Sequence, residues 1–399
     1  MDSLEPPRRI LIFSLAYYPK YVSGAEIAIR EVTDRVDQSC FAFSMITLRQ
    51  PGSPARERIG NVEIYRVGLG GAYLSKVLFV PLAAWKARQL HTNDPFDAIW
   101  AVMTYMLFPV VLARWLGVNL PHILTLQDGD LYERVFGRWF IRPFTPLLDH
   151  GFRTAACIHA ISQSLASWPV TRGFAGEVVT IPNGADPNDL DDDAYTEDMR
   201  DELRDELGIA SESVVLVNTA RLEFQKAFDE VIHALPLLPK HIVLLIVGGG
   251  TQEAALRKLA DALGVNERVI FAGLVPPEEV TRYRRAADMF VMPSRSEGIG
   301  IAGLSAMASR LPLIATREGG LAEYVFDSED ENEYGKTAWV VQKNDPKAIA
   351  QAVETILADP DETRTVTERA RKMIEEKYRW EGIAKDMEER VFAPVVEKQ

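Results

Sequence analysis

The stretch "MFVMPSRSEGIGIAGLSAMA", residues 289–308, decides the fold. Its first residues form an apolar run that predicts a buried strand, and the residues from about Gly300 onward predict a helix. Between the two lie Gly298 and a single carboxylate, Glu297. A strand, a glycine-bearing turn and a helix in this order are the repeating unit of a parallel α/β sheet.

The same unit recurs along the chain in two series. Apolar runs alternate with helical patterns, and we expect strands within residues 9–16, 40–48, 62–68, 97–103, 122–128, 157–163 and 177–184 for the first series and 213–222, 241–250, 268–274, 289–294 and 311–316 for the second. The fold class is therefore α/β, with two Rossmann-like domains whose parallel sheets face a central cleft. Ligands of such sheets bind outside the carboxyl ends of the strands.

An acidic segment, residues 185–213, separates the two series and suits a linker. The chain has 399 residues, and single cores stop growing at roughly 250–300 residues, so two domains are expected. We predict an N-terminal domain over residues 1–190 and a C-terminal domain over residues 191–378. Residues 379–399 predict a helix that comes too late in the chain to extend either sheet and that packs across the domain junction.

Composition excludes several classes of protein. The net charge of −13 argues against a nucleic-acid binder, which needs a basic surface. The two cysteines, Cys40 and Cys157, are far apart, so neither a disulfide framework nor a zinc site is indicated, and a cytoplasmic location fits. The longest uncharged stretch, residues 98–113, contains Pro109 and is shorter than the roughly 20 residues that span a bilayer.

Two cations follow the first strand of the second series. Arg221 and Lys226 stand in the loop and the first helical turn, where a guanidinium and an ammonium can hold a diphosphate. The alternative is that both are solvated surface charges. Their position at a strand end favours the functional interpretation.

Glycine-bearing turns follow three further strands. Gly249 and Gly250 allow close approach of a ligand, although they lack the full dinucleotide fingerprint and a tight turn is the simpler explanation. Amides at the turn after residue 294 form a ready anion site, and the adjacent Glu297 could bind the hydroxyls of the same ligand. The alternative is an acid that merely stabilises a helix N-terminus. This second turn contains Ser296, Gly298, Ile299 and Gly300. A similar turn follows strand 311–316 and contains Gly319 and Gly320, with Glu323 shortly after them.

The first series carries polar residues at its strand ends. Gly24 begins a helix and could meet a phosphate or a sugar, and Gln127, Asp128 and Asp130 follow another strand. His159 lies within a strand, which is typical of a satisfied core residue. No spacing of histidines and cysteines suggests a bound metal.

Together these motifs resemble the retaining glycosyltransferases of family 4, also called glycosyl transferases group 1, which have the GT-B fold. The resemblance runs through "YYPKYVSGAE", "TIPNGAD", "ARLEFQKAFDEVIHAL", "IVGGGTQEAALRKLADALGVNERVIFAGLVPPEEV" and "AADMFVMPSRSEGIGIAGLSAMASRLPLIATREGGLAEYV". It implies that Arg221 and Lys226 hold a donor diphosphate, that Glu297 and the amides at 298–300 hold the transferred sugar, and that Gly24 meets the diphosphate. The C-terminal helix would return to the first domain.

The sequence departs from the family pattern at several positions. The family usually carries a second glutamate that binds the donor ribose, and this chain has Ser305 there. A hydroxyl on a short stem cannot replace a bidentate carboxylate, so ribose recognition is expected to be weaker, water-bridged or relocated. The common histidine is replaced by Gln127, and Gly249 and Ala227 replace a frequent aspartate and glycine.

The resemblance implies an enzyme that transfers a sugar from a nucleoside diphosphate sugar, of UDP or GDP, to a glycan or a lipid-linked acceptor. No metal or other cofactor is expected, and the acceptor-side candidates are Gln127, Asp128 and Asp130. The alternative is a degenerate, non-catalytic protein that binds a sugar nucleotide or a partner.

Residues 134–144, "RVFGRWFIRPF", combine three arginines with four aromatic rings. They are either a peripheral contact with the inner face of a membrane or a core helix with solvated arginines. Residues 72–90 invite the same two interpretations.

Overall fold

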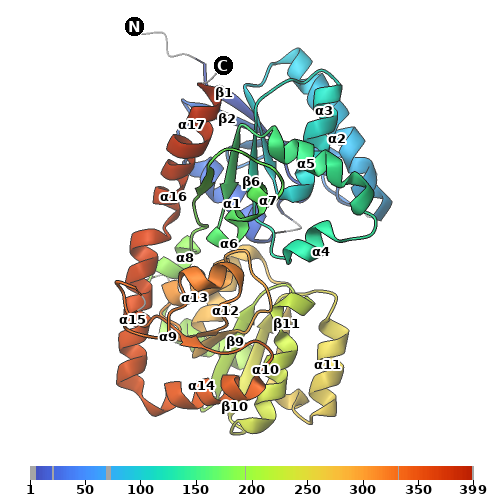
Figure 1. Cartoon of the computed structure of the whole chain (residues 1–399). Helices are drawn as coiled ribbons and strands as arrows, with labels where there is room; N and C mark the ends of the chain where they lie inside the picture. The colour runs from blue at the N-terminus through green and yellow to red at the C-terminus, as the bar shows by residue number, and fades with distance from the viewer. Residues whose placement is uncertain (1–5, 20–21, 69–72, 194, 331, 398–399) are drawn as a thin grey trace. The chain divides into compact units, whose positions relative to one another are not determined.

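The computed structural model describes residues 6–19, 22–68, 73–193, 195–330 and 332–397. It forms two compact units, one from Met1–Asn183 with Trp380–Gln399 and one from Gly184–Arg379, here called the N-terminal and C-terminal units (Figure 1). The sequence predicts the division after residue 190, and the contacts divide the chain after Asn183. Within the predicted domains, residues 1–5, 20–21, 69–72, 194, 331 and 398–399 lie outside the described parts.

The N-terminal unit is built on an eight-stranded sheet with the order β3-β4-β2-β1-β5-β6-β7-β8. All neighbours are parallel except β3 and β4, which are antiparallel. The strands are β1 (Arg8–Phe13), β2 (Phe41–Leu48), β3 (Arg56–Ile59), β4 (Val62–Val67), β5 (Ala98–Val102), β6 (His122–Leu126), β7 (Cys157–Ala160) and β8 (Val178–Thr180). The central strands are mostly apolar, and nearly all of their residues are buried, because helices cover both faces of the sheet.

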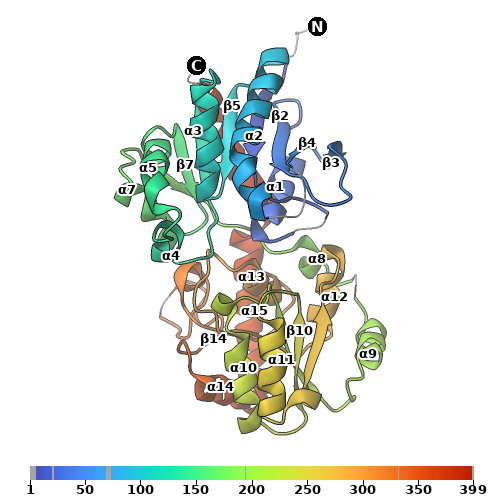
Figure 2. The same cartoon turned by 90° about the vertical axis from the view of Figure 1, so that its right-hand side faces the viewer.

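Helices of the N-terminal unit connect these strands. The chain moves one way along the sheet through α1, from β1 to β2, and the other way through α2, from β4 to β5, so right-handed crossovers place the two helices on opposite faces. Figure 2 shows α2 and α3 side by side. The helices are α1 (Gly24–Arg35), α2 (Tyr73–Asn93), α3 (Leu107–Trp115), α4 (Tyr132–Phe136), α5 (Thr145–Arg153), α6 (Gln163–Ala166) and α7 (Trp168–Thr171), with 3₁₀ turns η1 (Thr104–Met106) and η2 (Arg142–Phe144).

The C-terminal end of the chain returns to the N-terminal unit. It forms α16 (Trp380–Met387), the π-helix η8 (Glu388–Phe392) and α17 (Ala393–Val396), and α16 packs against α1 (Figure 1). The ring of Phe392 lies 5.0 Å from Trp100 and 5.7 Å from Phe43, centroid to centroid. Edge-on aromatic contacts of this kind add to the hydrophobic burial that holds the two ends of the chain together.

The C-terminal unit contains a six-stranded, fully parallel sheet with the order β11-β10-β9-β12-β13-β14. The strands are β9 (Val214–Thr219), β10 (Ile242–Val247), β11 (Val269–Gly273), β12 (Met289–Met292), β13 (Leu313–Ala315) and β14 (Trp339–Val340). The helices are α8 (Pro187–Leu190), α9 (Glu197–Glu206), α10 (Phe228–Ala234), α11 (Glu253–Ala262), α12 (Val280–Arg285), α13 (Ile301–Ala308), α14 (Pro346–Ala358) and α15 (Pro360–Lys377). The 3₁₀ turns are η3 (Phe224–Lys226), η4 (Leu235–Leu237), η5 (Asn266–Arg268), η6 (Pro277–Glu279) and η7 (Gly319–Glu323).

The start of the predicted linker is fastened to the C-terminal unit by buried arginines. Arg284 forms an ion pair with the fully buried Asp189 and another, at 3.2 Å, with Asp186. Arg371 of α15 donates to the carbonyl oxygens of Asp189 and Leu190 at 2.9 and 2.7 Å. Removing one partner of such a buried pair leaves an uncompensated charge, so these contacts hold residues 186–190 firmly in the unit.

Candidate functional site

Four loops that carry the sequence motifs meet at the carboxyl edge of the C-terminal sheet. They follow β9, β10, β12 and β13, which are neighbours in the sheet order. Leu222 N–H donates to Gly249 O at 3.0 Å, Arg295 N–H donates to Gln225 O at 2.7 Å, and Gly320 N–H donates to Glu297 O at 3.2 Å. Each loop is therefore bonded to the next.

Glycine is required where these backbones touch. A Cβ on Gly320 would lie 2.0 Å from the carbonyl oxygen of Gly298, and a Cβ on Gly250 would lie 2.4 Å from that of Leu222. Any side chain at either position would force the loops apart. The predicted residues Gly249, Gly250, Gly298, Gly319 and Gly320 thus lie together along one edge.

Glu297 lies at the centre of this edge, and its side chain is 5% exposed. Its Oε1 accepts hydrogen bonds from Lys226 Nζ at 2.5 Å and from Ser294 Oγ at 2.9 Å. The structure therefore joins two of the three predicted catalytic residues in one ion pair.

Arg221, the third predicted catalytic residue, is exposed. Its guanidinium makes no hydrogen bond or ion pair with any residue that the structure describes. Because a cation without an internal partner remains available to an anion, Arg221 suits the binding of a phosphate group.

Gly300 precedes α13 with a left-handed backbone (φ 81°), and its carbonyl oxygen accepts a hydrogen bond from Tyr324 Oη at 2.9 Å. Burial, aided by the negative charge of Glu297, holds the pKa of Tyr324 well above its usual value. The phenol therefore stays protonated and keeps this bond. Ser296 and Ile299 are buried in the same loop.

Ser305 is buried in α13, and its hydroxyl accepts a hydrogen bond from the backbone N–H of Asp186 at 3.0 Å. The hydroxyl that stands where the family pattern has a glutamate thus serves an internal contact. Glu323 is partly exposed at the end of η7, and its carbonyl oxygen accepts a hydrogen bond from Tyr378 Oη at 3.3 Å.

The acceptor-side candidates lie at the carboxyl edge of the N-terminal sheet. Asp128 is buried after β6, and its Oδ2 accepts from Thr104 N–H at 3.2 Å and from Thr104 Oγ1 at 2.9 Å. Burial raises the pKa of Asp128 to about 6. Gln127 Oε1 accepts from Asn183 Nδ2 at 3.1 Å, and Asp130 forms an ion pair with Arg138 at 3.0 Å.

Gly24 begins α1, and its N-terminus already has an internal acid. Glu26 Oε2 accepts from the backbone N–H of Ser23 at 2.8 Å, which is half of a capping box. A phosphate at Gly24 would meet this carboxylate close by, so the helix end is a weaker anion site than the glycine turn suggests.

His159 is a core residue, as the sequence predicts, and His122 is another. His159 Nε2 lies 2.8 Å from Ile181 O, and His122 Nε2 lies 3.0 Å from Gly151 O. Burial lowers the pKa of His159 to about 4, so the imidazole is neutral at pH 7. Among the described residues no group of three or more His, Cys, Asp or Glu is placed to hold a metal ion.

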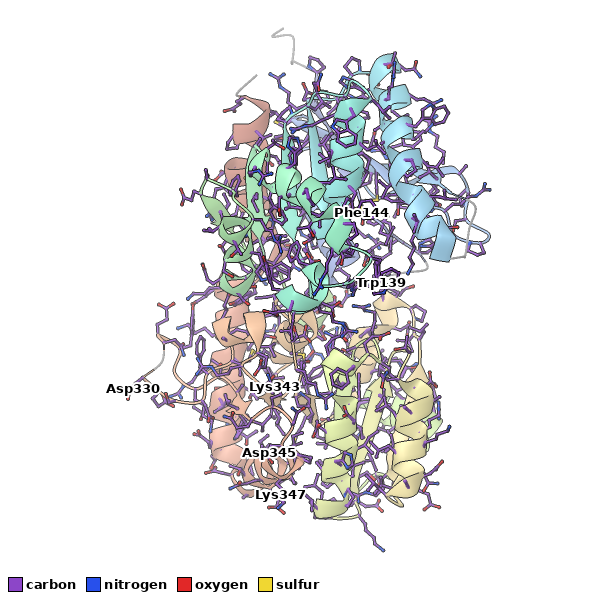
Figure 3. The ribbon with its side chains drawn as sticks, turned by 45° about the vertical axis from the view of Figure 1, so that its right-hand side comes forward. Trp139, Phe144, Asp330, Lys343, Asp345 and Lys347 are labelled. Carbon is purple, nitrogen blue, oxygen red and sulfur yellow. The ribbon has the colours of Figure 1, made fainter. Side chains whose placement is uncertain are left out.

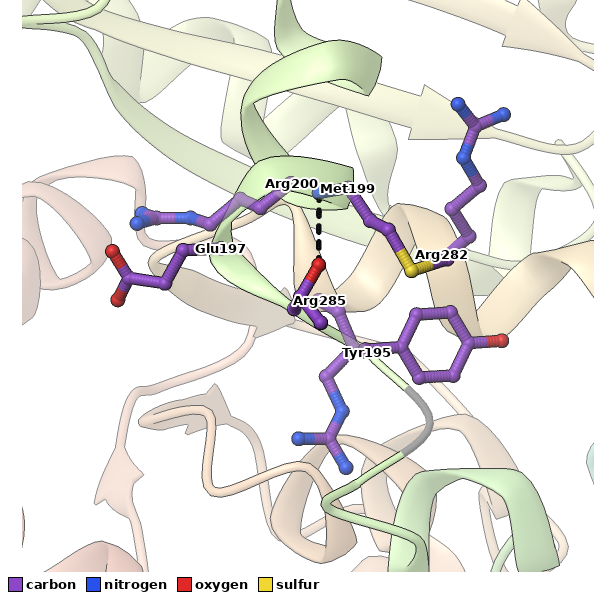
Figure 4. Close-up of a pocket in the computed structure, with 7 residues that line it drawn as sticks. Tyr195, Glu197, Met199, Arg200, Arg282 and Arg285 are labelled. Atoms are coloured by element: carbon purple, nitrogen blue, oxygen red, sulfur yellow. Dashed lines mark hydrogen bonds between the residues drawn. The ribbon is translucent and has the colours of Figure 1, made fainter.

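A separate cavity of about 150 Å³ lies between α9 and α12 (Figure 4). Arg200, Arg282 and Arg285 line it, and in Figure 4 their guanidinium groups point in different directions. Each already pairs with a carboxylate, of Asp288, Glu206 and Asp192 respectively. The cavity therefore lacks a convergent anion site.

Two family models match the chain. The model described as "Glycosyl transferases group 1" matches residues 199–377, and the "Glycosyl transferase 4-like domain" matches residues 23–184. A glycosyltransferase of Methanocaldococcus jannaschii is 32% identical over 404 residues, which cover 95% of this chain and 96% of that protein. The chain belongs to the glycosyl transferases group 1 family.

A second protein similar to this chain is a GDP-mannose-dependent alpha-(1-6)-phosphatidylinositol monomannoside mannosyltransferase of Mycolicibacterium smegmatis. The two are 35% identical over 210 residues, which cover 50% of this chain and 52% of the relative. The chain thus spans about half of that protein's length in the match.

Solved structures show the same GT-B fold. Sucrose-phosphate synthase from Thermosynechococcus elongatus has a TM-score of 0.81 at 22% identity, with 96% of this chain and 97% of that chain covered. Anabaena HepE in complex with UDP and glucose has a TM-score of 0.77 at 20% identity, with 96% and 98% covered. Two parallel-sheet α/β units are therefore the established architecture of this glycosyltransferase.

Sequence reasoning missed three residues that shape the two edges: Thr104, Arg295 and Tyr324. Each contacts a predicted residue, or the loop that carries it, from another part of the chain. Arg295 and Tyr324 lie within a quoted family motif, but the motif does not reveal these contacts. Arg295 lies inside the quoted stretch, yet its partners are 49 to 71 positions away.

Proposed function

We propose that this enzyme transfers a sugar, with retention of configuration, from a nucleoside diphosphate sugar to a glycan or a lipid-linked acceptor. The observation that carries the proposal is Arg221, whose guanidinium has no partner among the described residues, on the edge that also holds the Lys226–Glu297 ion pair. We place the reaction in cell-surface polysaccharide or glycolipid synthesis, in the cytoplasm or at the inner face of the membrane.

The charges of the C-terminal edge suit a departing diphosphate. In the proposed reaction the bond from the anomeric carbon to the diphosphate breaks, the bond to the acceptor oxygen forms on the same face, and the diphosphate takes the acceptor proton. Arg221 and Lys226 would stabilise the growing negative charge, and preorganised donors of this kind are usually the largest catalytic term. Because these cations supply the charge, we expect no metal requirement.

Glu297 would hold the transferred sugar. Its carboxylate lies beside Lys226, so a sugar bound to the first and a phosphate bound to the second are adjacent, as in the donor itself. The names of two similar proteins, one in complex with UDP and one GDP-mannose-dependent, support a UDP- or GDP-sugar as the donor.

The edge of the N-terminal sheet suits an acceptor with hydroxyl groups. Carboxylates such as Asp128 accept hydrogen bonds from sugar hydroxyls, and amides such as Gln127 both accept and donate them, whereas two carboxylates, Asp128 and Asp130, would repel a phosphate.

A membrane contact is the second part of the proposal. Trp139 and Phe144 are 83% and 51% exposed, on the segment between α4 and α5 (Figure 3). Arg134 of α4 and Arg142 of η2 are exposed as well, and this mixture of aromatic and basic side chains suits an anionic lipid surface. No helix among the described residues is both long and apolar enough to cross a bilayer.

Vesicle sedimentation tests the contact. Trp139→Ala with Phe144→Ala should lower binding to vesicles that contain anionic lipid, whereas Trp115→Ala, which removes another exposed tryptophan on α3, should not. Equal binding by all variants would contradict a membrane role for this segment.

The proposed transfer is tested by donor screening. UDP, GDP and their sugars should raise the melting temperature, because a ligand that binds only the folded state stabilises it. The stabilising donor should then be consumed with release of nucleoside diphosphate in the presence of acceptor and of a chelator. Stabilisation by the nucleotide without turnover on any acceptor would instead favour the degenerate, non-catalytic alternative.

A further inference from the structure

Arg295 makes more contacts at the C-terminal edge than any motif residue discussed above. Its Nε donates to Asn344 Oδ1 at 2.7 Å, its Nη1 to Phe224 O at 2.8 Å and to Asp229 Oδ1 at 2.9 Å, and its Nη2 to Asp229 Oδ2 at 2.7 Å and to Glu230 Oε1 at 2.6 Å. A guanidinium has five N–H donors, so all of them are used. The Phe224 ring also lies 4.4 Å from the guanidinium carbon.

These bonds join the two loops that carry Lys226 and Glu297. The Arg295 side chain binds Phe224 O, and its backbone N–H binds Gln225 O, so the two carbonyls before Lys226 are held by one residue. Glu297 follows only two positions after Arg295 in the chain. The relative placement of the Lys226 ammonium and the Glu297 carboxylate therefore depends on Arg295 at both ends.

The turn that carries Lys226 needs such support. Ala227, the next residue, is in the left-handed region (φ 54°, ψ 37°) although it has a side chain. That conformation is unfavourable for a non-glycine residue and persists only where surrounding contacts impose it. Arg295 supplies contacts on both sides of Ala227, to Phe224 before it and to Asp229 and Glu230 after it.

Arg295 does not itself attract a diphosphate. Asp229 and Glu230 balance its charge, and its side chain is only 12% exposed. Losing Arg295 should therefore disturb the geometry of the edge, and it should not add positive charge that could attract the diphosphate.

We propose that Arg295 is a positioning residue that sets the Lys226–Glu297 pair for the donor, by bonding the η3 turn and the first turn of α10 to the loop after β12. This inference rests on the proposed function, because the donor is the ligand that the pair serves.

Arg295→Lys is the first variant. Lysine keeps the charge but cannot reach several partners with a planar fork. We expect the affinity for the stabilising nucleoside diphosphate, UDP or GDP, to fall about 10- to 100-fold in calorimetry, the range seen when a group that orients a ligating side chain is lost. Asp229→Asn, which weakens the same contacts from α10, should lower the affinity as well. It replaces Arg295→Lys in this test if Arg295→Lys is poorly folded.

Arg268→Lys is the matched control. Arg268 also sits in the C-terminal unit and donates to the carbonyl oxygens of Leu235, Pro239 and Ile242, at 2.8, 2.9 and 2.9 Å. These partners lie at the amino edge of the sheet, so Arg268→Lys should lower the melting temperature without changing nucleotide affinity.

A double variant separates positioning from general stabilisation. If Arg295 acts through Lys226, adding Arg295→Lys to Lys226→Ala should lower affinity no further than Lys226→Ala alone. Additive losses, or unchanged affinity in Arg295→Lys with only a lower melting temperature, would overturn the inference. Wild-type protein that binds no nucleoside diphosphate would overturn the proposed function and this inference with it, and that result appears before any substitution is made.

Discussion

The carboxyl edges of the two sheets have the same topology and opposite chemistry. At the C-terminal edge, backbones touch through glycines, and two cations, Arg221 and Lys226, lie with the buried Glu297. At the N-terminal edge, Asp128 and Asp130 are accompanied by Gln127 and by hydroxyl and amide donors. The sheets themselves do not account for this difference, since the strands that carry these residues are parallel in both units.

The comparison teaches that the fold only supplies the place and the loops supply the function. A parallel sheet brings several strand ends to one edge, whatever residues follow them. The cations Arg221 and Lys226 make one edge suited to an anion, and carboxylates make the other suited to hydroxyl groups. The predictions below test this division.

The largest effect is expected at Glu297, if it serves the sugar and not the nucleotide. Glu297→Gln should lower kcat by about 10²- to 10³-fold, the range for losing one preorganised catalytic contact. Affinity for the nucleoside diphosphate should be unchanged or higher, because Lys226 loses its internal partner. Steady-state kinetics and calorimetry measure the two quantities, and equal losses in both would reassign the acid to nucleotide binding.

At the N-terminal edge, the buried Asp128 should make the free energy of unfolding depend on pH. Burial raises the pKa of Asp128 to about 6, whereas an unfolded aspartate titrates near 3.9. Between these values the folded protein binds more protons, so the free energy of unfolding falls as pH rises from about 4 to 6. The stabilisation is complete below about pH 4 and is lost above about pH 6.

Asp128→Asn removes this dependence. Its free energy of unfolding relative to wild type should rise by up to about 3 kcal/mol from pH 4 to pH 7, when denaturant unfolding is compared at each pH. A difference that stays constant with pH would show that Asp128 is not a buried acid of raised pKa.

The cations of the C-terminal edge come next. Arg221→Ala or Lys226→Ala should each weaken nucleoside diphosphate binding by about 1.5–3 kcal/mol, the range for hydrogen bonds to charged groups. Arg364→Ala, which removes an exposed arginine of α15, is the control and should leave affinity unchanged. Calorimetry that found no loss in either edge variant would show that this edge does not bind a diphosphate.

The smallest effect is expected at Ser305. Its hydroxyl serves the Asp186 amide, so Ser305→Ala should lower stability by about 1 kcal/mol, as for a typical hydrogen bond. Nucleotide affinity should stay within about twofold of wild type, because the hydroxyl is used by this internal contact. A larger loss of affinity than of stability would mean that Ser305 contacts the nucleotide.

Much of this architecture could be predicted from the sequence because its signals are local. Apolar runs, most of them ended by glycine turns, predicted the strands β9 to β13, and the strand-end rule put Arg221, Glu297 and Gly320 on one edge. The short strands β3 and β14 were missed, because runs of four or two residues carry too little pattern. The long helix α15 was likewise left unassigned.

Residues 134–144 show a limit of pattern reasoning. The sequence left a core helix and a membrane surface as alternatives, and the structure has two short helical pieces with Trp139 exposed between them. A core helix is thereby excluded for this segment, while the membrane contact stays a proposal.

Pairings across the chain could not be predicted. Lys226 and Glu297 are 71 positions apart, and Ser305 and Asp186 are 119 apart. Such contacts follow from how crossovers return each loop to the edge, and no local periodicity encodes them. Arg295 was missed for the same reason, since its partners become neighbours only after the sheet has formed.

The central claim is that the cations of the C-terminal edge bind the diphosphate of the donor. The most direct measurement compares the affinities of a nucleoside diphosphate and the matching monophosphate, by calorimetry, in wild type and in the Arg221→Ala/Lys226→Ala double variant. We predict that wild type binds the diphosphate clearly more tightly than the monophosphate, and that the ratio of the two affinities falls close to one in the double variant. A preference of the same size in both proteins would contradict it.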